Sequence, residues 1–216
     1  SRSFSEDTLY VTCWSEFRCM NVRKVPSVFV IVMDEKEELC EELLPEKYIL
    51  LSCELNCHAL YYSLMAKLKT SERVAEAQLI LSRALPDGIS ASGLIEIAAH
   101  LLENPIIIQD FTTKLMLHSQ IECREFNDEI LEDLFANGYV STALFVKYDY
   151  EHVLQQIEEN RSTFLLRSDQ KSERLICRLT INQKYFGWIL TVAFNQPFQD
   201  GDVEIMDYLS QAISLL

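Results

Sequence analysis

The segment NPIIIQDFTTKLMLHS, residues 104–119, decides the fold of the second half of the chain. Its apolar, β-branched residues predict one strand over 106–109 and a returning strand over 114–119, joined by a short polar turn. Asn104 and Pro105 end the apolar stretch 93–102, which predicts a helix. A helix that leads directly into an antiparallel hairpin indicates mixed α and β structure around an antiparallel sheet.

The residues after this hairpin predict further elements of both kinds. Helices are expected over 128–137, with Gly138 as the stop, and over 151–159, and a strand is expected within 139–147. Three more strands are expected over 163–167, 175–181 and 185–194, the last two forming a hairpin. Ile205, Leu209, Ile213 and Leu216 repeat at helical spacing and predict a terminal helix, capped by Asp200 or Asp202. Because no Gly, Pro or charged cap ends this helix, we expect the natural chain to continue.

The first half predicts a different arrangement. Strands expected over 8–14, 28–33 and 48–52 alternate with helices expected over 34–44 and 57–68, which indicates a small parallel α/β layer. We therefore expect a small α/β domain over residues 1–63, a linker helix over 64–86 and a sensor domain over 87–216. The linker helix contains no Gly or Pro before Pro86, and Leu64, Leu68, Ala75, Leu79 and Leu85 form a seam that can pack against a second copy.

The composition excludes several classes of function. A net charge of −14 and a pI near 4.7, without any cluster of Lys and Arg, argue against contact with nucleic acid or an anionic membrane surface. No stretch approaches the roughly 18 apolar residues of a membrane span. Seven cysteines, mostly inside apolar segments, indicate reduced thiols and a cytoplasmic location. Five glycines, none in a phosphate-binding motif, leave no cofactor to expect.

Two stretches resemble bacterial transcription regulators of the PucR/CdaR type. Residues 93–99 through 104–110, followed by 115–119, are similar to the opening of the sensor domain in that family. The sequence YFGWILTV over 185–192, followed by Phe198, Asp202 and the helix around Leu209, is similar to the closing hairpin and terminal helix of a GAF domain. The resemblance covers residues 70–216, and the first half loosely resembles the N-terminal α/β domain of PucR-type regulators. It implies a GAF-like sensor whose DNA-binding helix-turn-helix is absent from this sequence.

The candidates for chemistry are few, and we expect neither an enzyme nor a metal site. The spacing of Cys53, Cys57 and His58 differs from the paired Cys-x2-Cys pattern of zinc sites, which favours buried structural thiols. A Cys–His nucleophile would require the fold to bring the two side chains together, and adjacency in sequence does not do that. The acidic run 34–42 indicates a solvated helix face, because a calcium loop needs a Gly and alternating Asp or Asn residues.

Five residues are candidates for contact with a ligand: Arg167, Arg178, His118, Asp110 and Tyr148. Arg167 and Arg178 lie on predicted strands, where strand parity decides between an inward guanidinium that binds an anion and an outward one in a salt bridge. For His118 the alternative is a packed or exposed strand residue, and for Asp110 it is turn chemistry. Tyr148 belongs to a group of aromatics that either form the core or line a cavity.

Two functional hypotheses follow. The first is a sensor region that forms a homodimer through its helices, binds a small-molecule effector and relays the signal through its C-terminal helix to the absent DNA-binding domain. The alternative is a ligand-free scaffold for dimerisation or protein interaction, whose sensor pocket is filled by its own side chains.

Overall fold

The computed structural model describes residues 8–20, 27–33, 43–45, 47–51, 56–120, 128–166 and 172–216 of the chain. These residues form two compact units, Ser1–Lys69 and Thr70–Leu216. None of the described helices is both long enough and apolar enough to span a membrane.

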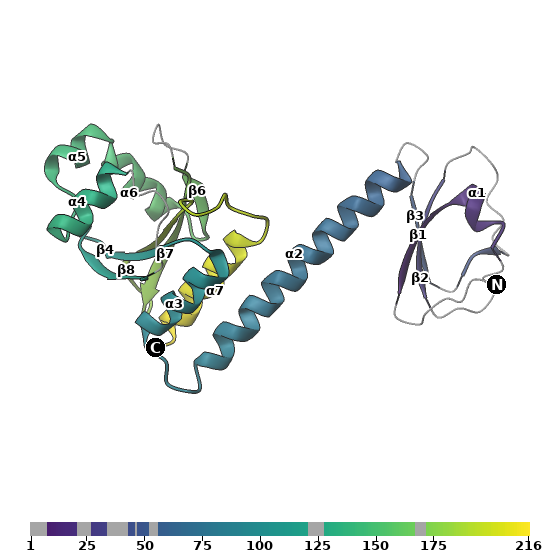
Figure 1. Cartoon of the computed structure of the whole chain (residues 1–216), viewed down its shortest axis with the longest axis horizontal. Coiled ribbons are helices and arrows are strands. Elements are labelled where there is room, and N and C mark those ends of the chain that lie inside the picture. Colours follow the sequence, from purple (N-terminus) through teal and green to yellow (C-terminus); the bar gives the residue numbers. More distant parts are fainter. Residues whose placement is uncertain are drawn as a thin grey trace. The chain divides into compact units, whose positions relative to one another are not determined.

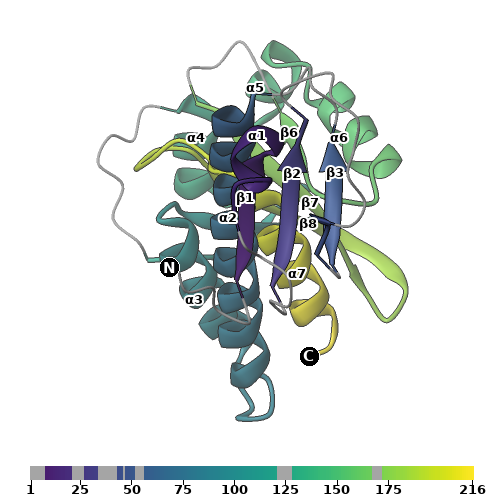
Figure 2. The ribbon, with the colours of Figure 1, turned by 90° about the vertical axis from the view of Figure 1, so that its right-hand side faces the viewer.

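The first unit contains a parallel three-stranded sheet, as predicted. Its strands are β1 (Leu9–Cys13), β2 (Val28–Val32) and β3 (Tyr48–Leu51), with β2 in the centre, and the short helix α1 (Trp14–Phe17) follows β1 (Figure 2). Trp14, Phe17, Phe29 and Ile31 are almost fully buried and form its core. The helix predicted over 34–44 lies almost entirely outside the described residues.

The helix α2 (Cys57–Ala84) is a single continuous helix of 28 residues. The sequence predicted helices over 57–68 and through 64–86, and they merge because no Gly or Pro interrupts them. Asn56 accepts hydrogen bonds from the backbone N–H groups of His58 and Ala59, which starts the helix. Near its other end, Ala77 and Leu81 are buried in the core of the second unit. The end of α2 is therefore part of the second unit's core.

The second unit is built on a five-stranded antiparallel sheet in the order β5-β4-β8-β7-β6. Its strands are β4 (Ile106–Asp110), β5 (Leu115–His118), β6 (Phe164–Leu166), β7 (Arg174–Ile181) and β8 (Lys184–Val192). Its helices, besides the end of α2, are α3 (Ala91–Leu102), α4 (Glu129–Asn137), α5 (Thr142–Lys147), α6 (Tyr150–Glu159) and α7 (Asp202–Ser214). The predicted fold class is confirmed: the chain is mixed α and β, and this unit has a GAF-like arrangement of an antiparallel sheet flanked by helices (Figure 1).

The sheet separates two hydrophobic cores. On one face, α3, α7 and the end of α2 pack against side chains such as Ile108, Cys177 and Ile189. On the other face, α4, α5 and α6 pack against Ile107, Ile176 and the remaining inward side chains of the sheet. Because the sheet is covered on both faces, its central strands are apolar on both sides, which explains the continuous apolar runs in the sequence.

Two local predictions were wrong. Residues 142–147 form α5 and not a strand, and within 139–147 only Tyr139 takes part in an isolated β-bridge, with Lys114. Neither Asp200 nor Asp202 caps the terminal helix: Gly201 is the N-cap residue, and no side chain caps there. Asp202 is instead buried, forms an ion pair with Arg73 of α2 and accepts a hydrogen bond from the Gln199 N–H. The long-range ion pair therefore replaces the local cap.

Candidate functional site

On the face of the sheet that is covered by α4, α5 and α6, the buried polar side chain of Gln109 lies among apolar residues. The Gln109 side chain is fully buried on β4. Its Oε1 accepts a hydrogen bond of 3.0 Å from the Trp188 indole and one of 3.5 Å from the Tyr150 hydroxyl. Its Nε2 donates to the Thr113 carbonyl at 3.0 Å. These contacts satisfy the amide within the core, so it does not need a ligand.

A buried ion pair lies on the same face. The Arg174 guanidinium on β7 donates to the Asp128 carboxylate, and both side chains are at most 5 % exposed. Asp128 is also the N-cap residue of α4, since its other oxygen accepts from the N–H groups of Ile130 and Leu131. The pair therefore attaches the start of α4 to a strand of the sheet.

The pKa of Tyr150 shows that water is excluded from this face of the sheet. Burial raises the pKa of its phenol to about 12, although the positive charge of Arg174 and the hydrogen bond to Gln109 oppose that rise. The phenol is therefore neutral at physiological pH. The side chains of Tyr150 and Trp188 fill the space between the sheet and the helices on this face.

An open pocket of about 350 Å³ lies near the end of α6 and is lined by Arg161, Arg178 and Thr180. Strand parity places Arg178 on the same face as Arg174 and Ile176, because Leu175, Cys177 and Leu179 point into the opposite core. The Arg178 side chain is half-buried on the face that faces α4, α5 and α6.

Two contacts hold the Arg178 guanidinium at this pocket. Its Nη1 donates to the Glu158 carbonyl at 3.1 Å, and its Cζ lies 4.7 Å from the centre of the Tyr185 ring. Its Nε is buried and has no hydrogen-bond partner among the residues that the structure describes. Burial, together with the Glu158 carboxylate, raises the pKa of Tyr185, which keeps that ring neutral beneath the guanidinium.

Three of the other candidates contact residues of this chain and line no part of that pocket. Asp110 Oδ1 accepts from the Thr112 hydroxyl and from the N–H groups of Thr112 and Lys114, so the turn interpretation accounts for this side chain. Burial opposes ionisation of Asp110, but these hydrogen bonds outweigh it and lower its pKa. The exposed His118 on the edge strand β5 packs edge-on against Phe135, with ring centres 5.1 Å apart. Tyr148 donates from its hydroxyl to Glu129, at 2.9 Å.

Of the five candidates, Arg178 lines the pocket described above, and Arg167 lies outside the described residues. Four residues of this region were not predicted from the sequence: Gln109, Asp128 and Arg174 on the packed face, and Arg161 at the pocket. One signal was available for Gln109, since an amide inside an apolar strand must find buried partners. Among the described residues no group of three or more His, Cys, Asp or Glu side chains is placed to hold a metal ion.

Comparisons with known proteins give little beyond the fold. No protein-family model matches the chain, and no curated protein matches it. Among solved structures, the cofactor-binding GAF domain of the nutrient sensor CodY from Clostridium difficile is similar, with 13 % sequence identity and a TM-score of 0.33. That match covers 63 % of this chain and 95 % of the CodY domain. At this TM-score the likeness places no residue, and the GAF-like description rests on the strand order and the helices of the sheet.

Proposed function

We propose that the Thr70–Leu216 unit is a regulatory sensor module that binds a small anionic effector at Arg178 and passes the signal to α7. One contact carries this proposal. The Arg178 side chain lies at the pocket, while its backbone carbonyl accepts a 2.9 Å hydrogen bond from the Ser210 hydroxyl on α7. A ligand that moves Arg178 would therefore act on the register of β7 against the terminal helix.

Further polar contacts attach α7 to β6 and β7. Asp207 of α7 accepts hydrogen bonds of 2.6 Å from the N–H and from the hydroxyl of Thr163, just before the edge strand β6. The buried Cys177 thiol, next to Arg178, lies 3.7 Å from the same Asp207 oxygen. The terminal helix is thus attached by polar contacts to the part of the sheet that carries the pocket.

The chemistry of the pocket favours an anion. Neither Arg161 nor Arg178 forms an ion pair with any residue in the described part of the chain, and the partners of Arg178 are a carbonyl and a ring face. Guanidinium groups bind carboxylates and phosphates through paired hydrogen bonds. The net charge of −14 would repel an acidic macromolecule from the rest of the surface, which favours a small anion as the ligand of these arginines.

A ligand screen with paired compounds tests this proposal. Small carboxylates and phosphates are compared with their neutral amide or alcohol analogues by thermal shift and calorimetry. An anion at 100 times its Kd should raise the unfolding free energy by about 2.7 kcal/mol, while the neutral analogue should leave it unchanged. Arg178→Gln should abolish the effect and the surface variant Lys114→Gln should not. A stabilising ligand that binds Arg178→Gln equally well contradicts the assignment.

A ligand-free scaffold is the second candidate, and the packed face around Gln109, Tyr150 and Trp188 favours it. In that case the sheet is a structural support for dimerisation or for another protein, and no anion in the screen changes the melting temperature. Both candidates share the proposal that this chain is not an enzyme, because the polar side chains of the packed face contact one another.

The wider role is proposed from the resemblance to PucR/CdaR-type regulators. The chain would be the cytoplasmic sensory region of a bacterial transcription regulator, and a helix-turn-helix domain outside this sequence would bind DNA. The acidic charge of this chain agrees with DNA binding by a separate domain, since the surfaces with which proteins bind nucleic acid are basic. Sequencing of the reading frame beyond Leu216 tests this role directly.

A further inference from the structure

Helix α2 has two apolar faces. One face, which includes Val74, Ala77 and Leu81, packs into the core of the second unit. The other carries apolar side chains that remain exposed, among them Leu68 at 46 % and Leu79 at 47 %. Leu68 and Ala77 are nine residues apart, which is two and a half helical turns, so the two faces point in opposite directions.

The exposed face follows the spacing of a coiled coil. Its residues, which we name the outer stripe, recur at alternating intervals of four and three: Tyr61, Met65, Leu68, Glu72, Ala75 and Leu79. Met65 is half-buried, the other five are exposed, and Glu72 is the charged member of the stripe. This is the spacing of the two seam positions of a heptad repeat, sustained over most of a helix of 28 residues. A partner for such a stripe is another helix with the same repeat.

We propose that the outer stripe is a dimer interface, in which α2 packs antiparallel against α2 of a second copy of this chain. A second copy has the same sequence and therefore carries the same repeat on its own α2. This proposal does not depend on a ligand at Arg178.

Charge decides the direction of the pairing. In a parallel pair, Glu72 would face the partner's Glu72 inside the seam, where like charges repel. In an antiparallel pair centred between Arg73 and Val74, Glu72 instead faces the partner's Ala75. Leu68 then faces the partner's Leu79, so that the two large exposed leucines cover each other.

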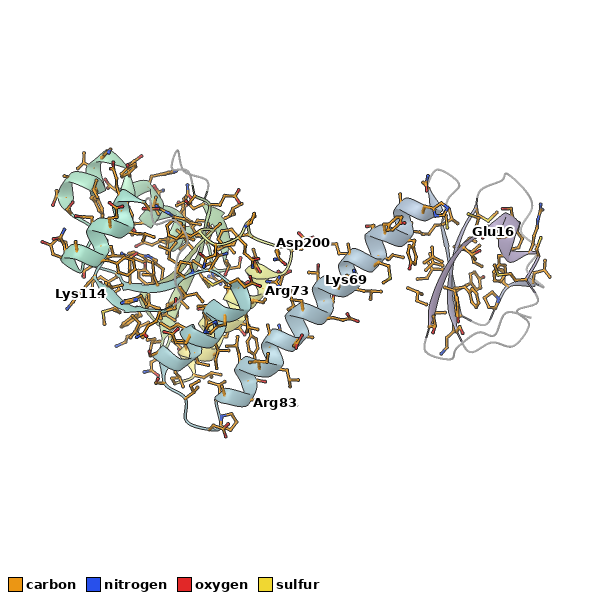
Figure 3. All side chains as sticks on the ribbon, in the orientation of Figure 1. Glu16, Lys69, Arg73, Arg83, Lys114 and Asp200 are labelled. Atoms are coloured by element: carbon orange, nitrogen blue, oxygen red, sulfur yellow. The ribbon has the colours of Figure 1, made fainter. Side chains whose placement is uncertain are left out.

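The flanks of the stripe support the same register. Lys69 and Glu76 follow the seam positions Leu68 and Ala75 and flank the seam, where charged residues set the orientation of a coiled coil. In this register Lys69 lies beside the partner's Glu76, and symmetry repeats this pair of opposite charges on the other side. Figure 3 labels Lys69 and Arg83 on α2, and Arg73 on the side of the helix that faces Asp200. The Arg73 side chain is bound to the Asp200 carbonyl and to Asp202, so it belongs to the inner face.

The mass of the full chain in solution, measured by light scattering over a concentration series, tests the interface. We expect a dimer of about twice 25.0 kDa. Leu68→Glu combined with Leu79→Glu should weaken the dimer at least tenfold without changing helix content, because both side chains are exposed. Val146→Glu, at an equally apolar residue on α5 that is 74 % exposed, is the matched control and should have no effect. A chain that stays monomeric at 100 µM overturns the proposal and assigns the stripe to a different partner.

A charge exchange tests the direction. Lys69→Glu and Glu76→Lys should each weaken the dimer several-fold, because each places like charges side by side in the antiparallel register. The double variant keeps the net charge and should restore the dimer. In a parallel pair these residues would contact the partner's Leu64 and Ser71, so the single variants would have little effect and the double variant would restore nothing. That result, or a dimer that tolerates glutamate at Leu68 and Leu79, overturns the proposal.

Discussion

Gly187 shows how closely two backbones approach inside the five-stranded sheet. It pairs with Asp110 across β4 and β8, and a Cβ atom placed on it would lie 2.0 Å from the Gln109 carbonyl oxygen and 2.7 Å from the Asp110 Cα. Both neighbours are backbone atoms, so neither can move aside without shifting β4. The turn after Asp110 depends on the same pairing, because the Phe111 N–H donates to the Phe186 carbonyl at 2.9 Å.

We therefore expect Gly187→Ala to destabilise the second unit by about 1–3 kcal/mol or more, as overpacking of a rigid site does. Equilibrium unfolding in urea measures this change. Gly88→Ala is the control for a change that affects backbone conformation without a steric clash. Gly88 has a φ of +72°, and no atom lies within 4 Å of the position that a Cβ would take. That variant should lose about 1–2 kcal/mol, which is the cost of a non-glycine residue in the left-handed region. If both variants lost the same free energy of unfolding, the close approach of the Gln109 carbonyl would not be what requires glycine at position 187.

At the residue scale, the sequence predicted local chemistry better than long-range contacts. The turn role of Asp110 follows from three hydrogen bonds within four residues, and such short-range bonds leave a sequence signature. The partners of the Gln109 Oε1 atom are Trp188, 79 residues away, and Tyr150, 41 residues away. No local pattern encodes such a pairing, and for that reason the packed centre of the candidate site was overlooked.

At the element scale, the link between α4 and β7 depends on Asp128 and Arg174. Removing one member of a buried ion pair leaves the other charge unsolvated and costs about 3–5 kcal/mol. Asp128→Asn should show this loss in urea unfolding while keeping the cap, since Asn also caps helices well. Asp128→Asn combined with Arg174→Met removes both charges and should recover most of the stability. A double variant as unstable as the single one would show that the hydrogen-bond geometry matters more than charge burial.

The same scale explains which elements the sequence predicted. Most strands and long helices appeared with boundaries within a few residues, because apolar periodicity and turn residues are local signals. The segment 142–147 was misread because Phe145 and Val146 favour strands, whereas the structure packs Leu144 and Phe145 from α5 against the core beside α6. Tertiary packing decided this short segment against its intrinsic preference. The prediction that Asp202 caps the terminal helix was wrong for a related reason, because an ion pair with Arg73 holds that buried side chain.

At the scale of the whole molecule, the compact unit Thr70–Leu216 includes the last part of α2, whereas the sequence predicted a sensor domain that begins at residue 87. The packing gives the physical reason for the earlier start. Ala77 and Leu81 are at most 1 % exposed, and Val74 and Ala84 pack beside them against the core that α3 and α7 form. The ion pair between Arg73 and the buried Asp202 adds a polar contact that the terminal helix needs.

Two fragments test where the folding unit begins. Residues 70–216 should unfold in a single cooperative transition, because they keep both cores. Residues 87–216 should lose the buried Leu81 and Ala77, and a buried leucine alone contributes about 2–5 kcal/mol when it is truncated. Because a whole domain is stable by only about 5–15 kcal/mol, we expect this shorter fragment to be largely unfolded or to lack a cooperative transition in urea. The longer fragment also lacks Tyr61, Met65 and Leu68 of the outer stripe, so it should fold as a monomer. A cooperative 87–216 fragment would show that α2 packs on a domain that is already complete.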